Sequence, residues 1–227
     1  MSDKFTPTSK EELLARAEAV AGLSLAGLAQ RLDIAMPSNS TQGKGFVGQL
    51  LELWLGATAG SLPQPDFQQL GIELKTIPIN AQAKPIESTY VSIVPLRDIA
   101  GLSWEQSDIY KKLQHILWIP ILTEKGLAIG ERIIGSPILW QPSPQQAVIL
   151  QQDWEELMDM VAMGEIEHIT ARLGTYLQIR PKGANASALT QAIGPEGESI
   201  MTLPRGFYLR TCFTQQILME ASHINSI

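Results

Sequence analysis

Three charged residues in the first third of the chain have the types and the spacing of a small hydrolytic metal site. Asp66 is followed, after six intervening residues, by the run Glu73-Leu74-Lys75. Side chains two residues apart on a strand share a face, so Glu73 and Lys75 would project together, and Asp66 in the preceding turn could curl back beside Glu73. Two adjacent carboxylates repel each other unless a cation neutralises them, and a hard divalent cation such as Mg²⁺ takes oxygen ligands. The spacing therefore predicts a metal site suited to phosphodiester cleavage, with Lys75 orienting the attacking water.

The same residues also have a structural explanation. Two like-facing charges can mark the solvent edge of a sheet, and the pattern D-x6-E-x-K is loose in an acidic chain. Glu52 strengthens the functional interpretation, because it is the only charge in an otherwise apolar helical run and a buried carboxylate needs a partner, a metal or an exposed face. Glu52 is thus either part of a thin solvent-exposed stripe or a third carboxylate directed at the same metal.

The elements that position these residues are a mixture of helices and strands. Ser9, followed by Glu11 and Glu12, is typical of a helix start, and apolar residues then recur at helical spacing. Further helices are expected at residues 25–32, 46–55, 108–115, 153–171 and 187–193. Apolar runs predict adjacent strands at residues 72–79 and 88–96, and further strands at 118–122, 133–140, 175–181 and 206–210. We therefore expect a mixed α/β fold that forms a single domain over residues 1–227, with two lobes and a boundary near residues 100–110.

The composition excludes several classes of protein. The 227 residues are 44% hydrophobic and 18% charged, which allows a sizeable core and argues against a disordered chain. Cys212 is the only cysteine, so an internal disulfide cannot form and a reducing compartment is expected. No apolar run approaches the roughly 20 residues of a membrane span, and the N-terminus lacks a signal-peptide pattern. We expect a cytoplasmic protein with no membrane partner.

The net charge of −6 argues against polyanion binding through bulk charge. The charge is unevenly distributed, because residues 1–167 carry 12 basic and 20 acidic groups, whereas residues 168–227 carry 5 basic and 3 acidic groups. Six of the acids fall between Asp153 and Glu167 with no basic residue among them, which indicates a solvated helix face. Any nucleic acid would therefore bind weakly through a local basic surface, with an affinity that falls quickly as salt rises.

Several long segments carry a resemblance to one known family: KGFVGQLLELWLGATAGS, DFQQLGIELKTIP, DWEELMDM, YLQIRPKGANA and LPRGFYL. Over nearly the whole chain the sequence is similar to the MutH family of DNA mismatch-repair endonucleases. The resemblance implies a restriction-endonuclease-like fold, with a mixed sheet flanked by helices and two arms around a DNA-binding cleft. By this resemblance Asp66, Glu73 and Lys75 are the catalytic triad. Glu52 is an accessory acidic residue of the metal site, and Lys112 matches a family lysine that lies near the active site.

The resemblance also implies an activity, a cofactor and partners. The activity is Mg²⁺-dependent nicking of the unmethylated strand at a hemimethylated GATC site, 5′ to the guanine, and Mn²⁺ or Ca²⁺ could occupy the same site. MutL stimulates it after MutS has found a mismatch, and a monomer is expected.

Further positions match the DNA contacts of the family. By this resemblance Arg180 grips guanine, Lys182 approaches phosphate, and Tyr208 senses the adenine methyl group. Each of these residue types also has an ordinary structural explanation. Lys44 could be a loop lysine, Lys112 could lie on the polar face of a helix, and Tyr208 could be a core tyrosine. The complete set of expected DNA contacts is Lys44, Gly45, Tyr90, Arg180, Pro181, Lys182 and Tyr208.

Two other functions stay open at the level of sequence. A type II restriction endonuclease would use the same carboxylates to cut both strands at GATC without a partner. A non-catalytic DNA-binding module would keep the carboxylates for structural reasons alone. Nicked and linear products from a plasmid, compared with and without MutL, separate these functions from strand nicking.

Overall fold

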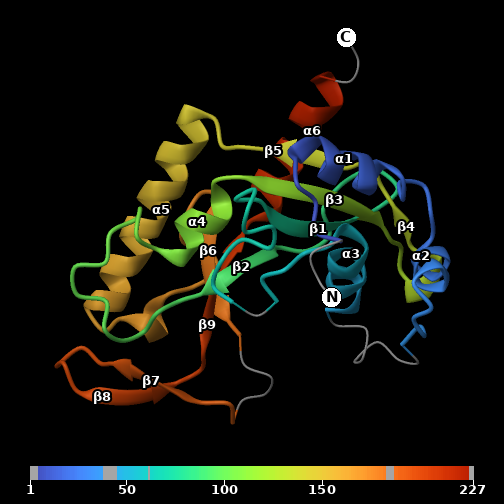
Figure 1. The fold of residues 1–227 in the computed structure, drawn as a ribbon. Coiled ribbons are helices and arrows are strands. Elements are labelled where there is room, and N and C mark those ends of the chain that lie inside the picture. The colour runs from blue at the N-terminus through green and yellow to red at the C-terminus, as the bar shows by residue number, and fades with distance from the viewer. Residues whose placement is uncertain (1–4, 38–44, 61, 183–186, 225–227) are drawn as a thin grey trace. The chain divides into compact units, whose positions relative to one another are not determined.

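The computed structural model describes residues 5–37, 45–60, 62–182 and 187–224 (Figure 1). The chain forms two compact units. The first unit contains Met1–Glu87, Gln114–Gln141 and Gln215–Ile227, and the second unit contains Ser88–Leu113 and Pro142–Thr214. Because the chain passes between the units four times, no single point in the sequence separates them.

A mixed sheet forms the centre of the first unit. β1 (Glu73–Ile79) runs parallel to β3 (Ile116–Leu122), with Glu73 opposite Ile116 and Ile79 opposite Leu122. β4 (Ile133–Ile134) and β5 (Ile138–Trp140) both pair antiparallel with β3. β3 is a continuous apolar run, which suits a central strand, and it is buried as far as Ile121.

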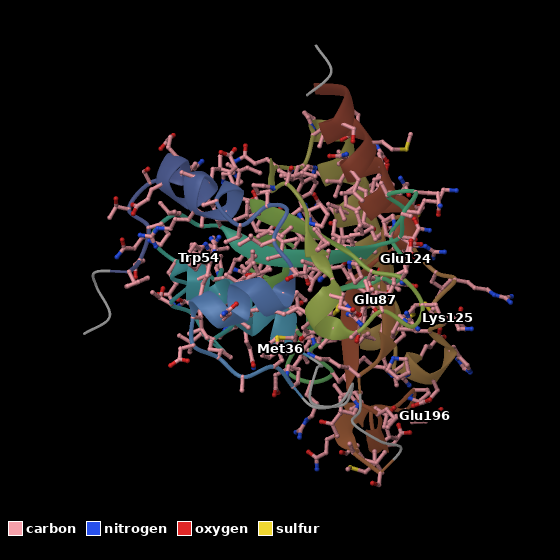
Figure 2. All side chains as sticks on the ribbon, turned by 90° about the vertical axis from the view of Figure 1, so that its right-hand side faces the viewer. Met36, Trp54, Glu87, Glu124, Lys125 and Glu196 are labelled. Carbon is pink, nitrogen blue, oxygen red and sulfur yellow. The ribbon has the colours of Figure 1, made fainter. Side chains whose placement is uncertain are left out.

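Three helices share one hydrophobic core with this sheet: α1 (Lys10–Glu18), α2 (Leu25–Arg31) and α3 (Phe46–Leu55). Ser9 caps α1, as predicted, by accepting a hydrogen bond from the Glu12 N–H at 3.1 Å. Trp54 of α3, labelled in Figure 2, donates its indole N–H to the carbonyl of Arg16 in α1 at 2.9 Å. The Arg16 side chain in turn contacts the Leu55 carbonyl at 3.3 Å, so the helix that carries Glu52 is fixed at its C-terminal end.

The second unit contains a three-stranded antiparallel sheet with β9 (Arg205–Leu209) between β2 (Thr89–Ile93) and β6 (Leu177–Pro181). α4 (Asp108–Leu113) packs against β2, and α5 (Pro144–Ala162) packs against β6. β7 (Thr190–Ile193) and β8 (Ser199–Thr202) form a separate hairpin (Figure 1). The remaining elements are η1 (Ile129–Glu131), η2 (Ile166–His168) and α6 (Thr211–Ile224). Among the described residues, no helix has both the length and the apolar character to cross a membrane.

The predicted mixed α/β class is confirmed, and the helices expected at residues 25–32, 46–55 and 108–115 are present with small differences at their ends. The strands expected at residues 72–79 and 88–96 are also present, but they are not adjacent. β1 pairs with β3, whereas β2 pairs with β9. Alternation of apolar and polar residues indicates a strand, but the partner of that strand depends on contacts distant in sequence.

The structure also corrects the elements predicted at residues 133–140 and 187–193. Residues 133–140 form two strands separated by residues 135–137, where the Gly135 N–H donates to the Pro120 carbonyl at 2.7 Å. A Cβ on Gly135 would lie 3.1 Å from that oxygen, so the glycine permits the close approach. The helix expected at residues 187–193 is absent, since residues 190–193 pair with β8 across a tight turn in which Gly197 has a φ of +79°.

The long acidic helix lies earlier in the chain than residues 153–171. Ser143 Oγ accepts from the Gln146 N–H at 3.2 Å, and Gln146 Oε1 accepts from the Ser143 N–H at 2.9 Å, which is a capping box. Pro144 in the first turn further favours this start. Soon after α5 ends, Gly164 takes a φ of +76°, a left-handed backbone conformation that does not continue a helix.

Asp153 corrects the prediction of a uniformly solvated acidic face. Glu155, Glu156 and Asp159 of α5 are exposed as expected, whereas Asp153 is only 4% exposed. Its carboxylate accepts three backbone N–H groups at the entry to β6, which are those of Thr175 at 2.7 Å, Tyr176 at 2.6 Å and Leu177 at 2.8 Å. Asp153 therefore joins α5 to β6.

We predict that Asp153→Ala destabilises the protein by about 3 kcal/mol, because three backbone N–H groups, of which that of Leu177 is buried, would lose a charged acceptor. Chemical denaturation measures the free energy of unfolding. The matched control is Asp159→Ala on the exposed part of the same helix, for which a change within about 0.5 kcal/mol is expected. Equal effects of the two substitutions would contradict the anchoring role of Asp153.

Candidate functional site

Glu73 and Lys75 form a buried ion pair on β1. Lys75 Nζ lies 2.5 Å from Glu73 Oε1, and the two side chains are 15% and 1% exposed. The Glu73 N–H donates to the carbonyl of His115 at 2.9 Å, so the pairing of β1 with β3 holds the backbone of this site. Burial, with a smaller effect of Lys10, lowers the pKa of the His115 imidazole, which therefore stays neutral at pH 7.

Asp66 lies in the turn that leads into β1. Gly71 has a φ of +63° in this turn, a conformation that glycine adopts without strain. The Asp66 carboxylate returns to β1, where Oδ2 accepts from the Leu74 N–H at 2.8 Å, and the residue is 8% exposed. Asp66 is thus hydrogen-bonded to the β1 residue that follows Glu73, so the two buried carboxylates are held at neighbouring positions of the strand. Together with Lys75 they carry a formal net charge of −1.

Glu52 is half-buried on α3, which contacts β1 within the first unit. The helix ends one turn beyond Glu52, since the N–H groups of Gly56 and Ala57 both donate to the Glu52 carbonyl at 2.9 Å. In the segments that the structure describes, no three Asp, Glu, His or Cys side chains form a group that could hold a metal ion. The role of Glu52 as a third carboxylate therefore stays a prediction.

A second group of predicted residues shares one face of the sheet in the second unit. Arg180 and Lys182 are two residues apart at the end of β6, and Tyr208 of β9 lies opposite Tyr90 of β2. The two tyrosine rings meet edge to face, with their centres 5.4 Å apart. Lys182 Nζ lies 3.3 Å from the centre of the Tyr90 ring, and Arg180 Cζ lies 5.8 Å from that of Tyr208. Edge-to-face and cation–π contacts therefore organise an aromatic–cation cluster of Tyr90, Arg180, Lys182 and Tyr208.

Gly206 makes the close packing of this cluster possible. A Cβ at this position would lie 3.0 Å from ring carbons of both Tyr90 and Tyr208. Burial raises the pKa of the Tyr208 phenol, and the nearby Arg180 partly opposes the rise. The Tyr208 hydroxyl therefore stays protonated at neutral pH and can donate a hydrogen bond.

The other predicted residues lie at the ends of elements or outside the described segments. Lys44 lies outside the described residues. Gly45 precedes α3 with a φ of +80°, and Pro181 is the exposed last residue of β6. Lys112 is half-buried on α4, in the second unit. Their roles stay predictions.

Two residues that support the aromatic–cation cluster were not predicted from the sequence. Ser88 accepts a hydrogen bond from Arg180 Nη1 at 2.8 Å across a separation of 92 residues, and no local pattern indicates such a contact. Gly206 did carry a signal, because a glycine inside an apolar strand often marks a close approach.

These observations define the class of protein. The first unit presents a carboxylate and a lysine on a strand of a mixed sheet and a second carboxylate from the preceding turn, a set suited to phosphodiester cleavage. The second unit presents cations and aromatic rings on one face, a set suited to DNA. Together they are the features of a restriction-endonuclease-like enzyme. The family described as the DNA mismatch repair enzyme MutH matches residues 55–153.

Similar proteins extend this match over nearly the full chain. The DNA mismatch repair protein MutH of Shewanella sp. strain W3-18-1 is 54% identical over 215 residues, which cover 95% of this chain and 96% of that protein. The protein of the same name from Vibrio cholerae serotype O1 is 53% identical over 217 residues, which cover 96% of this chain and 98% of that protein. The chain therefore belongs to the MutH family, as its sequence motifs predict, and it is a DNA mismatch-repair endonuclease.

The buried pair on β1 generates a prediction about stability. Lys75→Met should lower the free energy of unfolding by about 3 kcal/mol, because it leaves the Glu73 carboxylate buried without its cation. The double variant Glu73→Gln/Lys75→Met removes both charges and should regain most of that loss. Urea unfolding at pH 7 with a chelator measures both variants.

Lys84→Met, at an exposed lysine of the first unit, serves as the control and should change stability by less than about 0.5 kcal/mol. Equal losses of unfolding free energy in Lys75→Met and in the double variant would show that Lys75 does not compensate the buried charge of Glu73.

Proposed function

We propose that this endonuclease nicks the unmethylated strand of DNA at hemimethylated GATC sites, 5′ to the guanine, in a reaction that requires Mg²⁺ and is activated by MutL after MutS has located a mismatch. One observation carries the catalytic part of the proposal. Asp66 is hydrogen-bonded to the backbone of β1 next to Glu73, and Glu73 is paired with Lys75 on the same strand. Membership of the MutH family supports the DNA substrate.

The donor atoms at β1 suit a hard divalent cation. Asp66 and Glu73 offer carboxylate oxygens, and the net charge of −1 on these two residues and Lys75 favours a cation. We assign Asp66 and Glu73 as the residues that hold Mg²⁺, with Glu52 as a third acidic residue; Mn²⁺ or Ca²⁺ would use the same oxygens. When bound, Mg²⁺ supplies polarisation of the phosphoryl oxygen and offsets the negative charge that develops in the transition state.

Lys75 performs the part of the chemistry that belongs to the chain itself. Its ammonium is held beside Glu73 on an ordered strand, so it is positioned before DNA binds. From that position it orients the attacking water and stabilises the charge that grows on the phosphate. We place Lys112 near the reacting phosphate as an additional cation.

Sequence readout is assigned to the second unit and to the entry of α3. Arg180 donates to guanine O6 and N7, while Lys182 and Tyr90 contact the backbone beside it. Tyr208 senses the adenine methyl group, and Pro181 ends the strand that presents Arg180. Lys44 and Gly45 contribute a further DNA contact before α3.

A nicking assay tests the catalytic assignment. Glu73→Ala should lower the rate of nicking of a hemimethylated GATC plasmid, with Mg²⁺ and MutL supplied, by about two orders of magnitude or more. DNA binding should be retained. The control is Glu124→Ala, at the exposed glutamate labelled in Figure 2, which should leave the rate unchanged.

The products of this assay separate the possible functions. Nicked circles that appear only with MutL support the proposal. Linear products without MutL would instead indicate a restriction enzyme, and wild-type protein that leaves the plasmid intact would indicate a DNA-binding module.

A second prediction concerns methylation. Tyr208→Ser removes the ring and should narrow the ratio of nicking rates between hemimethylated and fully methylated sites. Tyr208→Phe keeps the ring that contacts Tyr90 and Arg180, so it separates the effect of the ring from that of the hydroxyl. Single-turnover rates on matched duplexes give the ratio. A ratio that Tyr208→Ser leaves unchanged would exclude Tyr208 as the sensor.

A further inference from the structure

The guanidinium of Arg180 is hydrogen-bonded to a residue at the opposite edge of its three-stranded sheet. Arg180 lies on β6, and Ser88 directly precedes β2, while β9 lies between these two strands. Arg180 Nη1 donates to Ser88 Oγ at 2.8 Å, and Arg180 Cζ lies 5.8 Å from the ring centre of Tyr208 on the intervening strand. The side chain therefore extends across β9, with the Tyr208 ring beside it and the Ser88 hydroxyl at its end.

These two contacts restrict a long side chain without using up its donors. A guanidinium carries five N–H groups, and Ser88 accepts one of them. Four remain, which is enough for a two-point contact with one base edge. The Tyr208 ring lies within cation–π range of the guanidinium, and the Ser88 hydroxyl holds one of its two terminal nitrogens, so the end of the side chain is restrained at two points. An exposed arginine would otherwise lose this rotational freedom at the moment of binding, at a cost to affinity.

We infer that Ser88 is a positioning residue for sequence recognition, which orients Arg180 for two-point contact with the guanine of the target site. The inference rests on the proposed function, because it takes Arg180 as the reader of that base. It adds a residue outside the segments that carry the family resemblance, and it makes one serine hydroxyl a determinant of discrimination rather than of catalysis.

The test is a double-mutant cycle read on two duplexes, one with a hemimethylated GATC site and one with its guanine replaced by 7-deazaguanine, which lacks the N7 acceptor. Ser88→Ala should weaken binding to the GATC duplex about three- to tenfold and raise KM with little change in kcat. The loss should be smaller on the 7-deazaguanine duplex. In an Arg180→Ala background, Ser88→Ala should have no additional effect.

Ser88→Thr keeps the hydroxyl and should restore discrimination, while Ser199→Ala, at an exposed serine of β8, should leave binding unchanged. A loss that persists in the Arg180→Ala background, or that is equal on the two duplexes, would overturn the role of Ser88. A wild-type protein that does not prefer the GATC duplex would overturn the proposed function instead. Thermal unfolding of each variant establishes that the fold is intact, and the Ser88→Thr result decides the question if Ser88→Ala does not fold.

Discussion

The charged pair buried on β1 is the constraint on which the first unit depends. An ionised carboxylate in an apolar interior costs several kcal/mol unless a partner and hydrogen bonds compensate it. Glu73 is compensated by Lys75 two residues later, and this works only while both project from the same face of the strand. A slip of β1 by one residue would turn both charges into the opposite face, so the parallel register with the apolar strand β3 preserves the site as well as the core.

The aromatic–cation cluster of the second unit is organised by weaker forces that are distributed over three strands. Arg180 of β6 and Lys182 directly after this strand each have an aromatic ring within cation–π range, and the two rings support one another across β2 and β9. Such contacts each contribute about 1 kcal/mol, and they order long side chains before a ligand arrives. Less conformational freedom is then lost on binding, which favours recognition by a small number of residues.

The sequence predicted those features that local chemistry determines. Two charges at a spacing of two on a strand, a carboxylate in the turn before it, and the Ser9 cap all depend on residues close in the chain. The grouping of Tyr90 with Lys182, and of Ser88 with Arg180, depends on the order β2-β9-β6, which no local pattern encodes. Asp153 was placed among solvated acids because its three partners are more than 20 residues away. The start of α5 carries a local signal, which is the capping pattern of Ser143, Pro144 and Gln146. The strand β7 has no such signal and depends on its pairing with β8.

The structure also changes what the charge distribution means for DNA binding. Residues 168–227 contain five basic residues, but two of them serve the fold. Arg205 is 7% exposed and pairs with Glu167 at 3.1 Å, and Arg210 donates to the carbonyls of three residues between Ala171 and Gly174. The charge available to neutralise phosphates in this region is therefore smaller than its composition implies, and non-specific affinity should be correspondingly low. An enzyme that discriminates through a few preorganised contacts while binding phosphates weakly gains little from searching DNA alone. The recruitment by MutL that we propose would raise the concentration of the enzyme near its target and so compensate for this weak binding.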